Sequence, residues 1–238
     1  MLQMINELKK LDAPKKIRIK FSKKGNLIFI SHLDLNRTFT RAIVRARIPV
    51  KYTEGFNPRP KLIFSTPLSV GCSSECEFLD LKIDREISTE QIKEQLSLQM
   101  PDGLQIIDVY EPSTKFTDII YSEYKIVIDD MSIDEYSAGK IDRIFSQSEL
   151  KIIKRSKSGD KQTDILPYIR NIDYTSEKGR LCVSAVLCVS SADFLNPEYI
   201  VSVIYDALGL SKENYMLGQG YSIVRRSLLI SDSKTMFK

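Results

Sequence analysis

Residues 16–50 read KIRIKFSKKGNLIFISHLDLNRTFTRAIVRARIPV, and this stretch combines a strand pattern, a turn and a helix pattern. Its first seven residues alternate basic and apolar side chains, which predicts a half-buried strand with a basic outer face. After the turn signal KKGN, Ser31 and Asp34 have the spacing of a capping box, and Pro49 ends the helix pattern. The stretch therefore predicts a strand followed by a capped helix.

The rest of the chain continues to alternate strand and helix patterns. Ser88 has the position of an N-cap, and Asn196-Pro197 marks another helix start, with Pro at the first helical position. The helices are predicted at residues 32–48, 89–99, 132–146 and 197–208. The strands are predicted at residues 16–22, 62–64, 77–83, 104–110, 121–128, 150–153, 165–174, 180–189 and 221–230.

The order of these elements resembles β-α-β-β-α-β in each half of the chain. The sequence therefore predicts the α+β fold class, with two tandem ferredoxin-like (β-α-β-β-α-β) domains that have antiparallel sheets. We expect a short leader with a helical tendency at residues 1–14. An N-terminal ferredoxin-like domain with a basic face is expected at 15–112, and a C-terminal ferredoxin-like domain at 119–238.

Composition excludes several classes of protein. Apolar residues make up 42% of the chain, which is a globular composition. No apolar run approaches the roughly 20 residues of a membrane span, and the N-terminus lacks a secretory pattern. The four cysteines, at positions 72, 76, 182 and 188, form no C-x-x-C pair and lack a histidine at metal-ligand spacing. We expect free thiols in the cytoplasm, with no metal, no cofactor and no membrane partner.

Positive charge is concentrated in the first quarter of the chain. Between Pro14 and Leu62 there are thirteen Lys or Arg residues and two acids, a net charge of +11, although the whole chain carries only +4. The remainder therefore carries −7. Such an asymmetry favours a phosphate-rich or acidic partner, although a merely solvated basic face is the alternative.

Two features present this charge. Arg37, Arg41 and Arg45 are spaced four residues apart, which predicts a row on one face of the first helix, and no acid lies four residues away from any of them. In the turn GFNPRP, two prolines hold Arg59 on a stiff extended segment, and Lys61 follows. These five residues are candidate ligands for RNA or for an acidic protein.

Phe56 and His32 each have two interpretations. We favour Phe56 as a turn anchor packed on the core, with an exposed stacking platform for a base as the alternative. His32 lies at the start of the predicted helix, where the helix dipole favours a neutral ring. It is a candidate RNA or partner ligand, a low-ranking candidate for a catalytic base, or a residue that simply packs over the cap.

A second basic segment, KRSKSGDKQTDILPY at 154–168, lies in the other half of the chain. Lys154 and Arg155 could extend a binding surface if they face the first half, and otherwise they belong to a solvated hairpin tip.

Five motifs resemble the radical-SAM-linked protein family, a bacterial domain of unknown function. They are SHLDL (31–35), RTFTRAIVRARIPV (37–50), GFNPRPKL (55–62), PLSVG (67–71) and KSGDKQTDILPYI (157–169). The resemblance implies that the protein stands beside, or is fused to, a cobalamin-binding radical SAM protein. The chain has no C-x-x-x-C-x-x-C motif, so it is not itself the radical SAM enzyme. Asp164 occupies the position of the aspartate in the family motif. The resemblance implies no role for this residue.

These observations favour a non-catalytic RNA-binding or accessory module in RNA modification or maturation. One alternative is a metal-independent endoribonuclease that uses His32 with Arg37, Arg59 or Lys61. The other is a domain that docks a radical SAM enzyme through its basic face.

Overall fold

The computed structural model describes residues 8–154, 159–211 and 220–238. The chain divides into two compact units, one that runs to Phe116 and includes Lys238, and one from Thr117 to Phe237. The fold class is α+β, as predicted, with four α-helices and antiparallel strand pairs among the described residues. Within the same residues, no helix is both long and apolar enough to cross a membrane.

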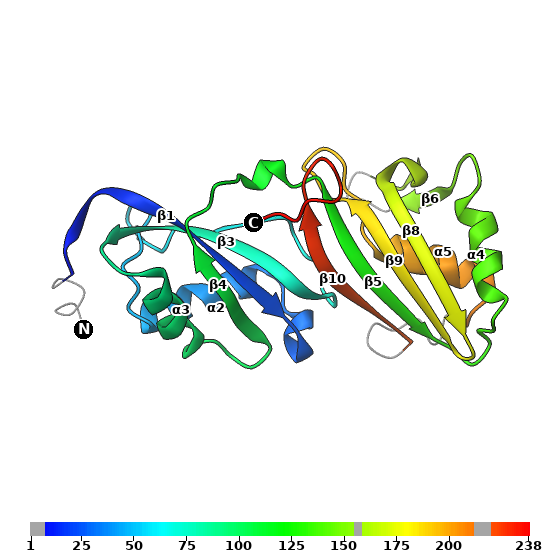
Figure 1. The fold of residues 1–238 in the computed structure, drawn as a ribbon, viewed down its shortest axis with the longest axis horizontal. Coiled ribbons are helices and arrows are strands. Elements are labelled where there is room, and N and C mark those ends of the chain that lie inside the picture. The colour runs from blue at the N-terminus through cyan, green and yellow to red at the C-terminus, as the bar shows by residue number, and fades with distance from the viewer. Residues whose placement is uncertain (1–7, 155–158, 212–219) are drawn as a thin grey trace. The chain divides into compact units, whose positions relative to one another are not determined.

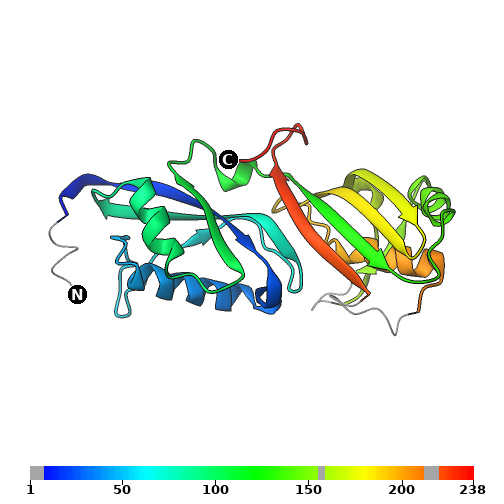
Figure 2. The ribbon, with the colours of Figure 1, turned by 60° about the horizontal axis from the view of Figure 1, so that its bottom comes forward.

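The first unit follows the predicted order of strands and helices. Its elements are β1 (Lys10–Lys23), the 3-10 helix η1 (Gly25–Phe29), α2 (His32–Arg45), β2 (Ile63–Phe64), β3 (Ser73–Arg85), α3 (Thr89–Ser97) and β4 (Leu104–Tyr110). The sheet has the order β4-β1-β3-β2, and all of its pairs are antiparallel. The helices α2 and α3 cover one face of this sheet (Figures 1 and 2).

The apolar face of α2 fixes its position on the sheet. Leu35, Phe39, Ala42 and Ile43 are buried at the predicted helical spacing. The Phe39 ring lies 4.7 Å from the ring of Phe21 in β1, measured between centroids. Alternate residues of β1 and β3 supply the sheet side of the same core. The unit is therefore held together by one hydrophobic layer between the helices and the sheet.

The second unit has a four-stranded sheet of the same relative strand order and a separate hairpin. Its elements are β5 (Tyr121–Asp129), α4 (Ser137–Phe145), β6 (Lys151–Lys154), β7 (Lys161–Asp164), the 3-10 helix η3 (Leu166–Tyr168), β8 (Ile169–Glu177), β9 (Arg180–Cys188), α5 (Glu198–Leu208) and β10 (Tyr221–Leu229). The sheet order is β10-β5-β9-β8, and β6 pairs with β7. Figure 1 shows α5 behind this sheet. A short 3-10 helix, η2 (Phe116–Asp118), precedes β5.

Several predicted element boundaries are wrong. Residues 10–14 belong to β1 rather than to a helical leader, and a register irregularity between Lys10 and Lys15 accommodates Pro14, which lacks an amide donor. Helix α4 begins five residues later than predicted, because the carboxylate of Asp134 accepts hydrogen bonds at 136 and 137 and forms a turn first. The strand predicted from 165 begins at 169, after the 3-10 turn that contains Pro167.

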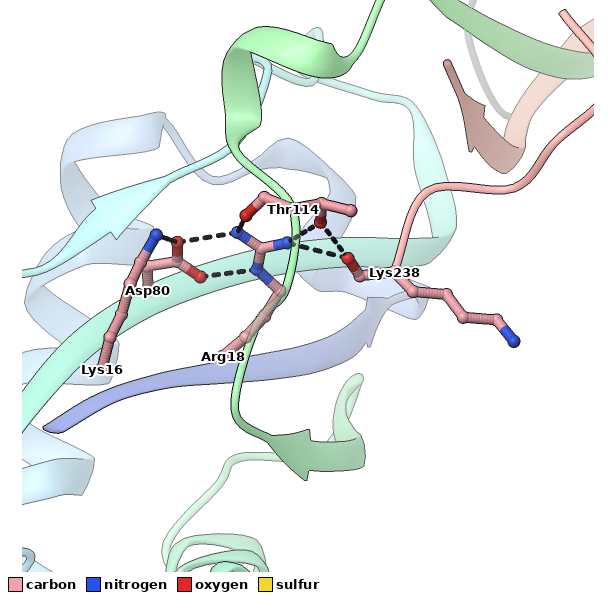
Figure 3. A network of polar contacts seen from close by, with 5 residues as sticks. All are labelled: Lys16, Arg18, Asp80, Thr114 and Lys238. Carbon is pink, nitrogen blue, oxygen red and sulfur yellow. Dashed lines mark hydrogen bonds and ion pairs between the residues drawn. The ribbon is translucent and has the colours of Figure 1, made fainter. Parts of the chain in front are cut away.

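The face of the first sheet opposite the helices is not a solvated basic face. Arg18 is fully buried, and its guanidinium forms two hydrogen bonds to the Asp80 carboxylate, Nε to Oδ1 at 2.7 Å and Nη2 to Oδ2 at 2.9 Å (Figure 3). Lys16 reaches the same carboxylate at 2.7 Å. Arg18 also donates through Nη1 to the Thr114 hydroxyl at 2.7 Å and to the Lys238 carbonyl at 2.9 Å. The sequence could not show this because Asp80 faces Arg18 across the β1–β3 register, 62 residues away.

Candidate functional site

The three arginines of the predicted row lie on α2, but their environments differ. Arg37 donates through Nη1 to the Asp34 carboxylate at 3.2 Å, so part of its charge is neutralised. Arg45 donates through Nη2 to the Gln99 carbonyl at 2.9 Å. Arg41 is exposed and has no carboxylate partner among the residues that the structure describes. Arg41 is therefore the member of the row that offers its whole charge to a ligand.

The pairing of Arg37 results from an incomplete capping box. Ser31 accepts the Asp34 amide, as predicted for an N-cap, but the Asp34 carboxylate accepts the Ser31 hydroxyl at 2.7 Å and the Arg37 guanidinium. Aspartate is shorter than the Glu or Gln of a full box, such as the one that Ser88 and Gln91 form at α3. The Ser31 hydroxyl, and then Arg37, lower the pKa of Asp34.

The C-terminal end of α2 carries a fourth exposed arginine in an unusual backbone conformation. The amides of Arg47 and Ile48 donate to the carbonyls of Val44 and Ile43, both at 3.2 Å, which is the hydrogen-bond pattern of a Schellman motif. Arg47 occupies the left-handed position of this motif, with φ 55°, where glycine is usual. A large cationic side chain therefore stands at a position where glycine would be unstrained.

The segment from 51 to 61 forms a narrow turn that displays Phe56. The Thr53 amide donates to the Arg59 carbonyl at 2.8 Å, and the Arg59 amide donates to the Thr53 hydroxyl at 3.2 Å. These bonds close the base of the turn and leave Gly55 at φ 124° near its tip. The Phe56 side chain has a relative exposure of 106%, so the interpretation of Phe56 as a core anchor is wrong. The turn satisfies its own backbone groups and projects Phe56 away from the core.

Seven exposed cations lie between the first turn of α2 and the end of this segment, with one acid, Glu54, among them. Arg59 and Lys61 are both exposed and have no carboxylate partner in the described part of the chain. In contrast, most cations of β1 and the following turn are buried or paired with acids: Arg18 and Lys23 are buried, and Lys15, Lys16 and Lys24 pair with carboxylates. The basic surface therefore belongs to α2 and the segment that follows it, rather than to β1. It consists of Arg37, Arg41, Arg45, Arg47, Lys51, Arg59 and Lys61.

His32 lies at the other end of α2, beside a small hollow. Its ring packs edge-on against Phe64, with the ring centroids 5.1 Å apart. The buried residues Lys23 and Glu77 line the same hollow, which has a volume of about 20 Å³, enough for about one water molecule. Neither Arg59 nor Lys61 is among the lining residues. Sequence reasoning did not identify Lys23 and Glu77, because an isolated charge at a strand end carries no signal of burial.

In the second unit, Lys154 ends β6 and donates through Nζ to the Phe194 carbonyl at 3.3 Å. Arg155 lies outside the described residues. The Asp164 carboxylate accepts the amides of Leu150 and Leu166, at 2.9 and 3.2 Å, so it joins the β6–β7 hairpin to the turn that follows. This gives Asp164 a structural role that the sequence did not reveal.

The cysteines are all free, as predicted, with Cys72 and Cys76 buried and Cys182 and Cys188 half-buried. Over residues 8–154, 159–211 and 220–238, no three His, Cys, Asp or Glu side chains are placed to hold a metal ion.

Two solved structures resemble the chain remotely. A crystal structure of an unknown protein from Galdieria sulphuraria is 10% identical and covers 92% of this chain and 100% of its own, with a TM-score of 0.25. The first two RRM domains of the yeast poly(U) binding protein Pub1 are 10% identical over 89% of this chain and 98% of theirs, with a TM-score of 0.19. At these TM-scores, neither likeness supports an argument. No curated protein matches the sequence.

A family model described as an uncharacterized protein conserved in bacteria (DUF2344) matches residues 16–197, which is most of the chain. The protein therefore belongs to this bacterial family.

Proposed function

We propose that this protein binds RNA through the basic surface of its first unit and acts as a non-catalytic module. The observation that carries the proposal is the wholly exposed ring of Phe56, in the same turn as Arg59. A ring with no contact to the core contributes nothing to folding, but it can stack on an unpaired base.

The surroundings of Phe56 support phosphate binding next to the stacked base. Pro58 and Pro60 restrict the backbone on both sides of Arg59, so little conformational entropy is lost when Arg59 binds. Arg41, Arg59 and Lys61 have no carboxylate to neutralise them in the described chain. Arginine pairs well with phosphate oxygens, and RNA recognition commonly combines such contacts with aromatic stacking.

The accessory role in RNA modification or maturation, in the cytoplasm and beside a radical SAM protein, rests on the family resemblance. We also infer that the units are tandem ferredoxin-like domains, since their main sheets have the same relative strand order. If the basic surface instead docks a radical SAM protein, the two purified proteins will co-elute at micromolar concentration without RNA.

Fluorescence anisotropy with a labelled stem-loop RNA tests the proposal. We expect Phe56→Ala to weaken binding by about tenfold, the effect of losing one stacked base. We expect Arg41→Ala and Arg59→Ala each to lower the slope of log K against log salt by about 1. Tyr136 and Arg143 are exposed residues at α4, so Tyr136→Ala and Arg143→Ala are matched controls. Wild-type protein that fails to bind at about 50 mM salt, where phosphate contacts are strong, would refute RNA binding.

One observation favours a second candidate function, metal-independent RNA cleavage. His32 shares its hollow with Lys23 and Glu77, a set that includes a base, a cation and a carboxylate. The test is to incubate the protein with end-labelled RNA in the presence of a chelator. Cleavage that His32→Ala abolishes and that Phe56→Ala only slows would support it, whereas intact RNA would rule it out.

A further inference from the structure

A groove lies between the C-terminal end of α2 and helix α3. It has a volume of about 360 Å³, which falls within the range of ligand sites and suits a single nucleotide. Arg45 and Arg47 line one side. The other side is lined by residues of α3 and its end, namely Gln91, Gln95, Leu98 and Gln99.

The electrostatic character of the groove favours an anionic ligand. Both arginines are exposed, and none of the described residues that line the groove is acidic. Glu90 and Glu94 are on α3 but are not among the lining residues. The bond from Arg45 to the Gln99 carbonyl uses one N–H group and holds the guanidinium at the groove, which leaves other donors on the same fork.

The opposite wall offers groups that suit the edge and face of a base. Gln91 is committed to the capping box of α3, because its carbonyl accepts the Ser88 amide. Gln95 and Gln99 each add a donor and an acceptor, which is what pairing with the edge of a base requires. Leu98 lies between these two glutamines in the sequence. It is 77% exposed and supplies an apolar surface.

The backbone at Arg47 adds an independent argument. Arg47 has φ 55°, a conformation that glycine adopts without strain, so a large cationic side chain stands where glycine is usual. Its side chain lines the groove, where a second cation beside Arg45 has a use.

We propose that this groove holds one unpaired nucleotide of the bound RNA, with its phosphate on Arg45 and Arg47 and its base against Gln95, Leu98 and Gln99. The inference rests on the proposed function, RNA binding, and adds a second contact site to the turn that carries Phe56. An unpaired nucleotide fits better than a duplex, because proteins read RNA bases mainly where they are splayed out of a helix.

The test uses the full chain and a stem-loop RNA that carries a photoreactive 4-thiouridine either in the loop or in the stem. We expect the loop probe to crosslink within residues 95–99 and the stem probe not to do so. We expect Gln95→Ala/Gln99→Ala to weaken binding by about tenfold, the discrimination of one base contact, with an unchanged salt slope. Arg47→Gly removes a charge and should lower the slope by about 1.

Two variants outside the groove are the controls. Lys93→Ala removes an exposed charge from α3, and Gln105→Ala removes an exposed amide from β4. Melting curves establish that each variant is folded, and the exposed Gln95 side chain can be tested alone if the double variant melts early. Groove variants that bind as wild type, while Phe56→Ala weakens binding, overturn this inference alone. Wild-type protein without RNA affinity overturns both this inference and the proposed function.

Discussion

Removal of the Asp80 carboxylate is the most informative perturbation of the fold. Asp80 accepts two hydrogen bonds from Arg18 and an ion pair from Lys16, and its side chain is 3% exposed. Asp80→Ala leaves the guanidinium of Arg18 buried, with Thr114 and the Lys238 carbonyl as its remaining acceptors in the network of Figure 3.

The structure predicts an asymmetry between the two partners. An uncompensated buried charge costs about 3–5 kcal/mol, so we expect Asp80→Ala to lower the free energy of unfolding by that amount. Arg18→Met should cost less, about 1–3 kcal/mol, because Lys16 still pairs with Asp80 at 2.7 Å and is 42% exposed to solvent. The double variant should cost less than the sum, because no unpaired buried charge is left.

Urea unfolding followed by far-ultraviolet circular dichroism measures these differences. With a slope of about 2 kcal/mol per molar urea, Asp80→Ala should lower the midpoint by about 2 M. Hydrogen exchange should assign the loss of protection to β1 and β3. The reasoning is refuted if the two single variants lose the same free energy of unfolding. It is also refuted if the loss in the double variant equals the sum of the two single losses, because the Arg18–Asp80 pair would then not be coupled as its burial indicates.

Three further predictions concern the core, a helix end and a turn. Phe39→Ala should lower the free energy of unfolding by about 3–5 kcal/mol, because Phe39 is fully buried at the centre of the helix–sheet layer; chemical denaturation measures it. Arg47→Gly should raise the free energy of unfolding by about 1 kcal/mol, since glycine adopts φ 55° without strain; a lower stability by the same assay would contradict this. Asp232 has a pKa lowered to about 2, chiefly by its bonds to Thr235. A lowered folded-state pKa gives stability above the unfolded value near 3.8 that is lost as the pH falls toward 2, so the protection of the amides of residues 234 and 235, measured relative to the unfolded chain, should fall in that range.

The sequence predicts the local features of the fold well. The burial of Leu35 and Phe39, the cap at Ser88 and the end of α5 at Gly209 depend on neighbours within a few residues, which spacing and residue type reveal. The burial of Arg18 depends on a carboxylate that only the strand register brings beside it. A basic position on an alternating strand therefore looks solvated in the sequence until its long-range partner is known.

The candidate site was predictable in composition but not in arrangement. The sequence indicates a basic helix and a stiff turn, and the structure places both on the surface. The i,i+3 spacing of Asp34 and Arg37 allows an ion pair, but the sequence does not show whether Asp34 serves the capping box or Arg37. Nor does it reveal that Phe56 points away from the core, because an aromatic residue in a Pro-rich turn is compatible with either orientation.

Departures from local rules in the first unit fall into two kinds, buried charges and the unusual conformations of two residues on the basic surface. Arg18 and Lys23 are buried charges, but each has hydrogen-bond acceptors within the fold, so folding accounts for them. Arg47 keeps a left-handed backbone conformation, and Phe56 exposes its whole ring. Natural sequences depart from local consistency mainly at functional sites. Both departures lie within residues 37–61, the segment that carries the basic surface, so the RNA binding proposed for that surface would account for the two together.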